Sequence, residues 1–259
     1  MLLFSEIIKE YPAKFQSFGR FIMREYLQYK ILQIIFDSMY AKELAFMGGT
    51  ALRLIYGNSR FSEDLDFDNF NMPIERFNQL SESIKKELGK EGYEVEMRTV
   101  HKGAYHCYIR FPELLYNEGL SGYKEEKILI QLDTEPQAYD FEPESIILNK
   151  FDVFTQIAVV PLPILLAQKF YAILNRKRNK GRDFFDVIFI LSKIQSPDYS
   201  YLSQKLGISN AAELKARILE KCDQLDMAEM AKDVAVFLFE PKDVNKVKLF
   251  PSYIAQATL

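Results

Sequence analysis

The first half of the chain alternates between two hydrophobic periods. Residues 4–42 carry apolar side chains at helical spacing, and the stripe from Phe21 to Met39 is wide enough to be buried on more than one side. An apolar run at 44–47 is typical of a short buried strand, and residues 73–89 form an amphipathic helical pattern that ends at glycine. From Tyr93 the period shifts towards two, which predicts strands over residues 93–97, 105–111 and 127–133.

The second half changes to helical periodicity. Residues 145–160 alternate apolar and polar positions and complete the expected sheet. Pro161 and Pro163 then mark a boundary and the first turn of a helix, where proline is tolerated. Further helical segments follow at 165–174, 183–191, 199–206, 210–222 and 226–238. The pattern therefore predicts an α+β protein, with a mixed β-sheet flanked by helices in residues 1–155 and a helical C-terminal part in residues 156–259.

The composition excludes several classes of protein. The chain has 259 residues, 48% of them hydrophobic and 27% charged, which is ordinary for a soluble globular protein. Its net charge of −3 excludes a global basic field, so any contact with nucleic acid must use a local patch. The N-terminus lacks the features of a signal peptide, and prolines interrupt the longest apolar segment, so we expect a cytoplasmic protein without a membrane span.

Two familiar kinds of site are not supported by the sequence. His101, His106, Cys107 and Cys222 lack the spacing of a tetrahedral zinc set, and the two cysteines are expected to be reduced thiols. The chain contains no G-x-x-x-x-G-K-[ST] sequence, so a P-loop nucleotide site is not predicted.

A glycine turn follows the first expected strand. Gly48, Gly49 and Thr50 interrupt the apolar run, and Thr50 is expected to cap a short helix. Glycines let a backbone approach a ligand closely, and the free N–H groups at a helix start favour an anion. This stretch is therefore a candidate cradle for the triphosphate of an NTP. Arg60 and Ser62 are expected near the same NTP, where they hold the following strand against the glycine turn.

Acidic residues then alternate with large apolar residues. Asp64 and Asp66 are two positions apart on an expected strand, so their carboxylates share a face while Leu65 and Phe67 point into the core. Two like charges side by side are costly unless a cation lies between them, and Mg²⁺ takes oxygen ligands while leaving positions for substrate phosphates. A solvated, acidic edge strand is the alternative. The glycine turn directly before these acids favours a phosphoryl-transfer site.

These residues resemble a known family. A Gly-Gly turn followed by Asp64-x-Asp66 is similar to the signature of the polymerase-β-type nucleotidyltransferases. The longer sequence around these residues, GGTALRL and then RFSEDLDF, resembles that of the AbiEii-like nucleotidyltransferase toxins of type IV abortive-infection toxin–antitoxin systems. The resemblance covers residues 44–190 well and the helical tail loosely. It implies a nucleotidyltransferase fold, a Mg²⁺-dependent transfer of a nucleoside monophosphate from an NTP to an acceptor hydroxyl, and a cognate antitoxin as a partner.

The resemblance also implies a third carboxylate at the end of a later strand. Asp133 fits this position, Glu135 is the nearby competitor, and a turn residue is the structural alternative. A third acid would let the site hold two Mg²⁺ ions. Asp64, Asp66 and Asp133 are therefore the expected metal ligands, and a carboxylate can accept the proton of the attacking hydroxyl.

Two helices in the second half extend the resemblance. The AbiEii-like group has a lysine on one helix and then an R-D-x-x-D stretch. The arrangement of Lys169 followed by Arg182, Asp183 and Asp186 is similar to these two motifs. By that resemblance, Lys169 and Arg182 neutralise the donor triphosphate, Asp186 is an active-site acid, and Arg182 and Asp183 order a donor pocket that the helical part closes. Asp183 and Asp186 share a helix face, so a structural ion pair is an equal alternative for Asp183.

A basic stretch lies between these two helices. Arg176, Lys177, Arg178 and Lys180 form the most concentrated positive patch of an acidic chain, and they are candidates for binding nucleic acid. A solvated loop that caps a helix C-terminus is the equal alternative. The resemblance includes nucleotide addition to tRNA 3′ ends, so tRNA is the expected acceptor. One alternative is an acceptor that is a protein or a small molecule. Another is that the chain is a non-catalytic NTP-binding module.

Overall fold

The computed structural model describes residues 2–259, with the exception of the side chain of Lys102. The chain divides into two compact units. The first unit contains the residues up to Ile55 together with Ser62–Val159, and the second contains Tyr56–Phe61 together with Val160–Leu259. The sequence places the boundary after residue 155, whereas the structure places it after Val159 and also assigns a short internal segment to the helical unit.

Contacts with the C-terminal helices explain why segment 56–61 belongs to the second unit. The backbone N–H of Phe61 donates to the carbonyl of Phe237 at 2.8 Å. Arg60 forms an isolated antiparallel β-bridge with Leu238. The chain therefore leaves the first unit after the glycine helix and returns to it just before the acidic strand.

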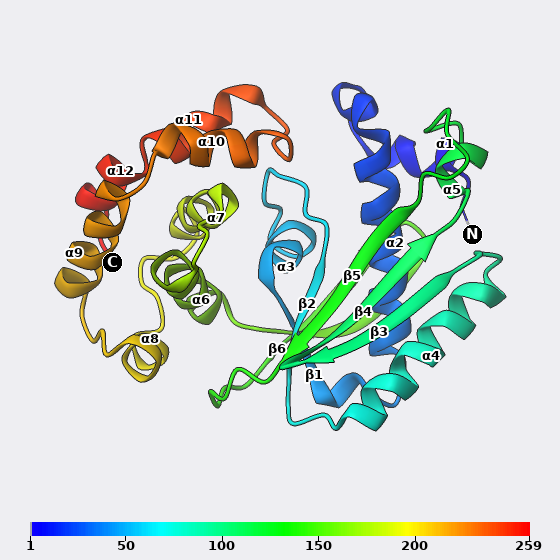
Figure 1. Ribbon diagram of the computed structural model, residues 1–259, viewed down its shortest axis with the longest axis horizontal. Coiled ribbons are helices and arrows are strands. Elements are labelled where there is room, and N and C mark those ends of the chain that lie inside the picture. The colour runs from blue at the N-terminus through cyan, green and yellow to red at the C-terminus, as the bar shows by residue number, and fades with distance from the viewer. Residues whose placement is uncertain (1) are drawn as a thin grey trace. The chain divides into compact units, whose positions relative to one another are not determined.

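The first unit is built on a seven-stranded sheet with the strand order β3-β4-β5-β2-β1-β7-β6 (Figure 1). β2 pairs with β5 and β1 pairs with β7 in parallel, and the other neighbours are antiparallel. This confirms the predicted mixed sheet, although β3 begins three positions later than the expected strand at 93–97. The strands are β1 (Leu44–Met47), β2 (Leu65–Asn69), β3 (Glu96–Lys102), β4 (Ala104–Phe111), β5 (Ile128–Glu135), β6 (Glu144–Lys150) and β7 (Val153–Val159).

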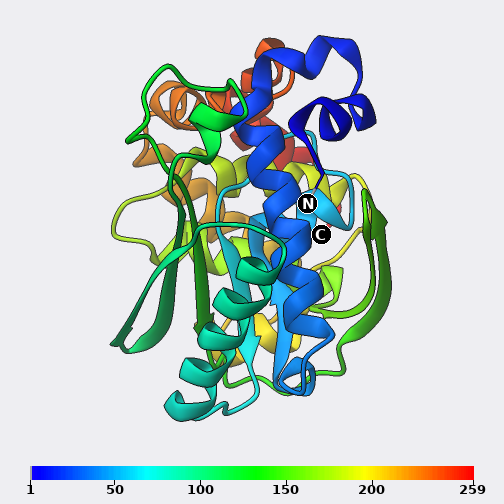
Figure 2. The same cartoon turned by 90° about the vertical axis from the view of Figure 1, so that its right-hand side faces the viewer.

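Two long helices pack on one face of the sheet and against each other (Figures 1 and 2). α2 (Gly19–Phe36) contacts β5 and β7, and α4 (Ile74–Lys90) contacts β3 and β4. Side chains of β4 alternate accordingly, because Cys107, Ile109 and Phe111 are buried while the residues between them are partly exposed. Burial raises the pKa of the Cys107 thiol to about 11. The sheet therefore has one covered face and one more open face.

The N-terminal region is divided where a continuous helical pattern was expected. α1 (Phe4–Ile7) and the 3₁₀ segments Ile8–Glu10 and Ala13–Phe18 precede α2. Pro12 lies between the two 3₁₀ segments and interrupts the helix there, because proline lacks the N–H group that a continuous helix needs. The wide apolar stripe of α2 is buried, as the pattern predicts. The remaining helical segments of this unit are Ala41–Glu43, which is 3₁₀, α3 (Gly48–Leu54) and α5 (Leu114–Asn117).

The second unit is helical. Asp198, Asn210 and Asp226 each accept a backbone N–H at a helix start, which satisfies donors that the helix leaves open. α11 and α12 have no counterpart in the expected segments, because each is too short to show a helical period. The helices are α6 (Leu162–Asn175), α7 (Gly181–Leu191), α8 (Tyr199–Leu206), α9 (Ala211–Asp223), α10 (Met227–Ala235), α11 (Val244–Lys248) and α12 (Phe250–Gln256). In the described part of the chain, no helix combines the length and apolarity that crossing a bilayer requires.

Candidate active site

A glycine joins β1 directly to α3. Gly48 has φ +79°, a left-handed conformation that side chains disfavour. A Cβ atom placed on Gly48 would collide with the carboxylate of Asp66. Met47, the residue before it, is the antiparallel partner of Asp66. Glycine is therefore required here for two reasons, and the turn lies in van der Waals contact with the first acid of the strand.

The carboxylates of β2 and β5 are neighbours in the sheet. Asp66 and Asp133 are partners in the parallel register, so their side chains leave the sheet on the same face. Glu135, the competing candidate, pairs instead with Asp68. The register therefore places Asp133, and not Glu135, beside Asp66.

Two residues that the sequence did not identify as functional hold Asp133. His106 on β4 is its antiparallel partner, and His106 Nδ1 lies 2.7 Å from Asp133 Oδ1. The amide of Gln131 donates to both carboxylate oxygens of Asp133 at 2.9 Å. Gln131 could have been found from its spacing, because residues two apart share a strand face. The contact with His106 depends on the register between strands, which the local pattern does not specify.

The segment that leads into β2 is held through its carbonyl groups. The Thr50 hydroxyl donates to the carbonyl of Asp64, and the Gln28 amide donates to those of Ser62 and Glu63 at 3.1 and 2.9 Å. Asp64 itself precedes the strand, which begins at Leu65. Thr50 does not cap the helix, because α3 already begins at Gly48. Thr50 and Gln28 thus make contacts that the sequence assigned to Arg60 and Ser62.

The expected metal ligands do not form a closed cage. In the part of the chain that the structure describes, no three His, Cys, Asp or Glu side chains are grouped so that they could hold a metal ion. What the sheet supplies is the pair Asp66 and Asp133 in register, with Asp64 two residues before Asp66.

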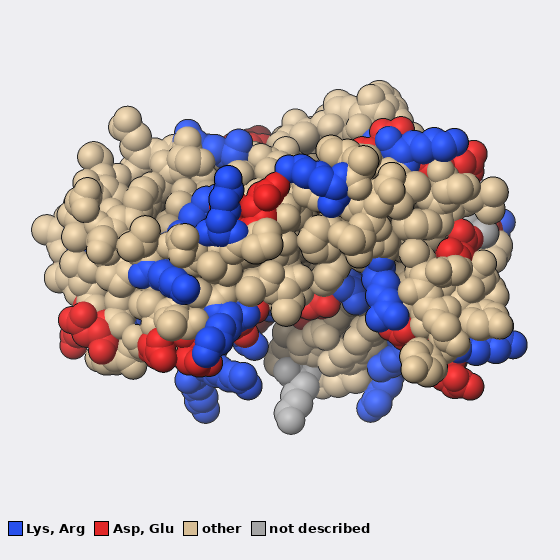
Figure 3. Space-filling view, turned by 90° about the horizontal axis from the view of Figure 1, so that it is seen from above, with Lys and Arg blue, Asp and Glu red and all other residues tan. Residues whose placement is uncertain are grey.

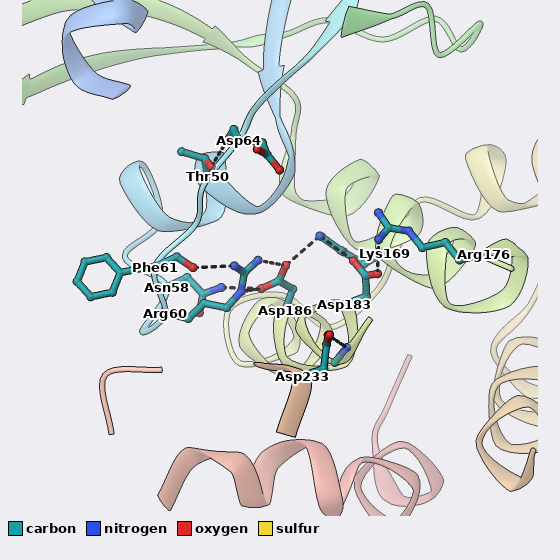
Figure 4. A network of polar contacts seen from close by, with 11 residues as sticks. Thr50, Asn58, Arg60, Phe61, Asp64, Lys169, Arg176, Asp183, Asp186 and Asp233 are labelled. Atoms are coloured by element: carbon teal, nitrogen blue, oxygen red, sulfur yellow. Dashed lines mark hydrogen bonds and ion pairs between the residues drawn. The ribbon is translucent and has the colours of Figure 1, made fainter. Parts of the chain in front are cut away.

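The second unit contains a buried ion cluster centred on Asp186 (Figure 4). Arg60 binds this carboxylate through two parallel hydrogen bonds, from Nε at 2.7 Å and from Nη2 at 2.6 Å. Asn58 donates to the same carboxylate at 2.8 Å, and Lys169 Nζ lies 2.9 Å from it. The Arg60 and Asp186 side chains are 1% and 0% exposed. The Asp186 carboxylate therefore ties segment 56–61 to α7 within the second unit.

The charges around Asp186 determine its ionisation. Burial by itself would raise its pKa, but the neighbouring Arg60 and Lys169 outweigh this and lower the pKa to about 2. Lys169 also pairs with Asp183 at 3.1 Å, and Arg176 lies 3.3 Å from the other oxygen of Asp183. Both acids of the R-D-x-x-D stretch therefore lie in ion pairs within the second unit, which is the arrangement of the structural alternative.

The basic loop between α6 and α7 has one buried anchor. Arg176, Lys177 and Arg178 are exposed, and Lys180 is partly exposed. Asn179 is buried and donates to the carbonyl of Ile173 at 2.6 Å. On the face shown in Figure 3, lysine and arginine side chains are interspersed with acids, in keeping with the net charge of −3.

Comparison with known proteins identifies the family. The model described as the nucleotidyl transferase AbiEii toxin of type IV toxin–antitoxin systems matches residues 30–246. The chain belongs to the AbiEii family. This confirms the resemblance found at the glycine turn and the acidic strand, and it makes the protein a nucleotidyltransferase. The matched AbiEii residues include the carboxylate pair of the first unit and the ion cluster of the second.

Solved structures confirm the nucleotidyltransferase-like fold. JHP933 from Helicobacter pylori matches with a TM-score of 0.53 and 18% identity, over 91% of this chain and 91% of that one. A second H. pylori protein, described as a candidate nucleotidyltransferase, matches with a TM-score of 0.54 and 18% identity, over 90% of this chain and 93% of that one. No curated protein matches the chain. At 18% identity these two structures show a shared fold alone.

Gly48→Ala is expected to lower the rate of nucleotide transfer by about a hundredfold, because the new Cβ displaces Asp66 and a shift of about 1 Å can cost that much. The left-handed conformation adds about 1–2 kcal/mol of strain. Gly57→Ala is the matched control, since Gly57 has φ +77° and no atom within 4 Å of an added Cβ. Steady-state rates of both variants test this, and equal rates would show that the turn does not position Asp66.

Proposed function

We propose that this AbiEii-family nucleotidyltransferase is a toxin that transfers a nucleoside monophosphate from an NTP to a hydroxyl group of RNA, with tRNA as the expected acceptor. The carboxylate pair Asp66 and Asp133, in register beside the Gly48 turn, carries the proposal. The acceptor oxygen forms a bond to the α-phosphorus, the bond from that phosphorus to the bridging oxygen breaks, and pyrophosphate leaves. A carboxylate accepts the proton of the attacking hydroxyl.

The donor set of the sheet fits Mg²⁺. This hard cation prefers oxygen ligands and is commonly held by one or two carboxylates together with substrate phosphates, so the pair in register suffices without a closed protein cage. We propose Asp66 and Asp133 as its ligands, and Asp64, two residues before Asp66, as the third acid of the site. When bound, Mg²⁺ would neutralise charge on the phosphates and on the attacking oxygen.

Residues of this chain provide the remaining interactions. Gly48 and Gly49 let the backbone approach the donor phosphates closely. Lys169 and Arg182 supply positive charge to those phosphates, and Asp183 orients the Lys169 ammonium group through its contact at 3.1 Å. Asp186 acts through Arg60 and Lys169 as a positioning residue, because its carboxylate is fully buried. The family model includes these residues, because it matches residues 30–246.

Neutralising the basic loop is expected to weaken RNA binding. Replacing Arg176, Lys177 and Arg178 together by Gln should lower the affinity for RNA at least tenfold. The slope of the logarithm of the RNA association constant against the logarithm of salt concentration should fall in magnitude by about 2, because about 0.7–0.9 counterions are released for each phosphate contact. The matched control replaces Lys85, Lys86 and Lys90, which are exposed on α4. Equal affinities for the two triple variants across a salt series would contradict this role of the loop.

A labelling assay tests the proposed acceptor. The protein is incubated with Mg²⁺ and each of the four NTPs labelled at the α-phosphate, once with total tRNA and once with cell protein. The proposal expects label on tRNA. Label on protein alone would replace RNA with a protein acceptor. No transfer to either pool, with NTP binding intact, would contradict a macromolecular acceptor and favour a small molecule or a non-catalytic module.

A further inference from the structure

The open face of strands β3, β4 and β5 carries side chains that no role above uses. On β4, Tyr108 and Arg110 alternate with the buried residues Cys107 and Ile109, so they lie on the face opposite α4. Arg98 on β3 is exposed, and it is the antiparallel partner of Tyr108. We call Arg98, Tyr108 and Arg110 the sheet-face patch.

The two arginines of this patch are available to an anion. Within the residues that the structure describes, no carboxylate lies at ion-pair distance from Arg98 or Arg110. Glu96 is the antiparallel partner of Arg110 on this face, and its carboxylate is paired with Lys127 at 2.7 Å. The Arg110 guanidinium lies 5.8 Å from the centre of the Tyr108 ring. The patch thus combines an aromatic ring with two arginines that take part in no ion pair among the described residues.

The register makes this patch continuous with the carboxylate pair. Tyr108 is the partner of Gln131, and two residues along the same strand His106 is the partner of Asp133. Two residues of a strand span about 7 Å, so the tyrosine ring lies about one step along the sheet from the row that contains Asp133 and Asp66. A chain molecule with repeating anionic and aromatic groups could follow this row towards the carboxylates.

We propose that the sheet-face patch binds the terminal nucleotides of the single-stranded 3′ end of the acceptor RNA. A base stacks on Tyr108, and the phosphates on either side of it contact Arg98 and Arg110. Aromatic rings and arginines on an open sheet bind unpaired bases in this way, whereas a paired duplex hides its base faces. The strand then leads the terminal hydroxyl towards Asp66 and Asp133. This inference rests on the proposed RNA acceptor, and it concerns a surface separate in sequence from the loop at 176–180.

The chemistry of the patch favours RNA over a protein partner. A protein interface at this position would be expected to bury a larger apolar area, but the exposed apolar side chain on the same face of β5 is Leu129 alone among the described residues of that strand. Two unpaired arginines that flank an aromatic ring match the alternation of phosphate and base along a polynucleotide. The occupant is therefore a single strand of RNA.

The test uses the full chain and a short single-stranded RNA with the acceptor's 3′ sequence. Tyr108→Ala is expected to weaken oligonucleotide binding, measured by fluorescence anisotropy, by about tenfold to a hundredfold, and to raise KM for RNA with little change in kcat. Tyr108→Phe keeps the ring and should bind as the wild type does. Tyr123→Ala removes another tyrosine of the same unit, 73% exposed, and serves as the matched control. Arg98→Gln with Arg110→Gln should lower the salt slope by about 1.4.

The outcomes separate this inference from the proposed function. If the wild type transfers nucleotide to RNA but Tyr108→Ala binds the oligonucleotide as tightly as Tyr123→Ala does, the sheet-face patch is not the acceptor site and the proposed function stands. If the wild type transfers no nucleotide to any RNA, the proposed acceptor and this inference both fail. Loss of binding in Tyr108→Ala that Tyr108→Phe restores would establish stacking on the ring, because a merely structural role would not require an aromatic side chain.

Discussion

Asp66→Asn is expected to lower the rate of nucleotide transfer by about a thousandfold or more, because it removes the negative charge that holds the cation and the transferring phosphate. Asparagine has nearly the same shape, so the contact with Gly48 and the pairing of β2 should survive. The loss should therefore lie in kcat, with the free energy of unfolding unchanged or raised, since the neutral amide no longer repels Asp133.

The control for this prediction lies on the same strand. Asp68→Asn makes the same chemical change two residues away, at a buried position where the carboxylate accepts the backbone N–H of Gln137 at 2.9 Å. This variant should cost about 1 kcal/mol of stability and keep most of its activity. Rates of transfer, together with urea unfolding of both variants, separate the two effects. A wild-type kcat in Asp66→Asn would show that Asp66 is not a catalytic residue.

Asp186→Leu is expected to lower the free energy of unfolding by about 3–5 kcal/mol, because it leaves the buried guanidinium of Arg60 without its carboxylate partner. Replacing both residues, as Arg60→Met with Asp186→Leu, should cost less than the sum of the two single changes, since no uncompensated charge then remains. Urea unfolding of the two single variants and of the double variant measures the interaction free energy between Arg60 and Asp186. Strict additivity would show that the pair does not act as a unit.

Exposed ion pairs supply the control for the buried cluster. Lys232 pairs with Glu229 on the surface of α10, so Lys232→Met should leave the free energy of unfolding nearly unchanged. The cluster should also respond to acid. Because its folded-state pKa is lowered to about 2, Asp186 contributes its full stabilisation above its unfolded pKa of about 3.9, and it loses this as pH falls towards 2. Asp186→Leu should therefore flatten the pH dependence of stability below pH 4.

The local sequence pattern was enough to predict the elements around the site. Gly48 and the alternating acids of β2 give a turn and a strand whose geometry follows from glycine's freedom and the period of two. The neighbour relation between Asp66 and Asp133 came from the family resemblance, and the parallel register agrees with it. The mixed sheet and the helical character of the second half follow from hydrophobic period.

Contacts between distant segments lay beyond the pattern. Arg60 and Asp186 are 126 residues apart in sequence, and nothing in either segment indicates the other as a partner. The shared face of Asp183 and Asp186 did indicate an ion pair, and Lys169 pairs with both. The contact of His106 with Asp133 was not predicted, because it depends on strand register, which is specified by the packing of whole strands and not by residues near His106 in the chain.

The division into two units also depends on contacts between residues that are far apart in sequence. Segment 56–61 lies between two motifs of the sheet unit, so continuity along the chain favours that unit. Its placement with the helices follows from the β-bridge between Arg60 and Leu238 and from the buried contact with Asp186, both of which join residues far apart in sequence. Short elements such as α11 have too few residues to establish a period.

A nucleotidyltransferase moves the α-phosphate of the NTP to its acceptor together with the nucleoside, and the position of a label in the NTP tests this. The protein is incubated with acceptor RNA and an NTP labelled either at the α-phosphate or at the γ-phosphate, while released pyrophosphate is measured. Label is expected to enter RNA from the α-position only, with one pyrophosphate released for each nucleotide added. Label entering from the γ-position, or pyrophosphate release without labelled RNA, would contradict it.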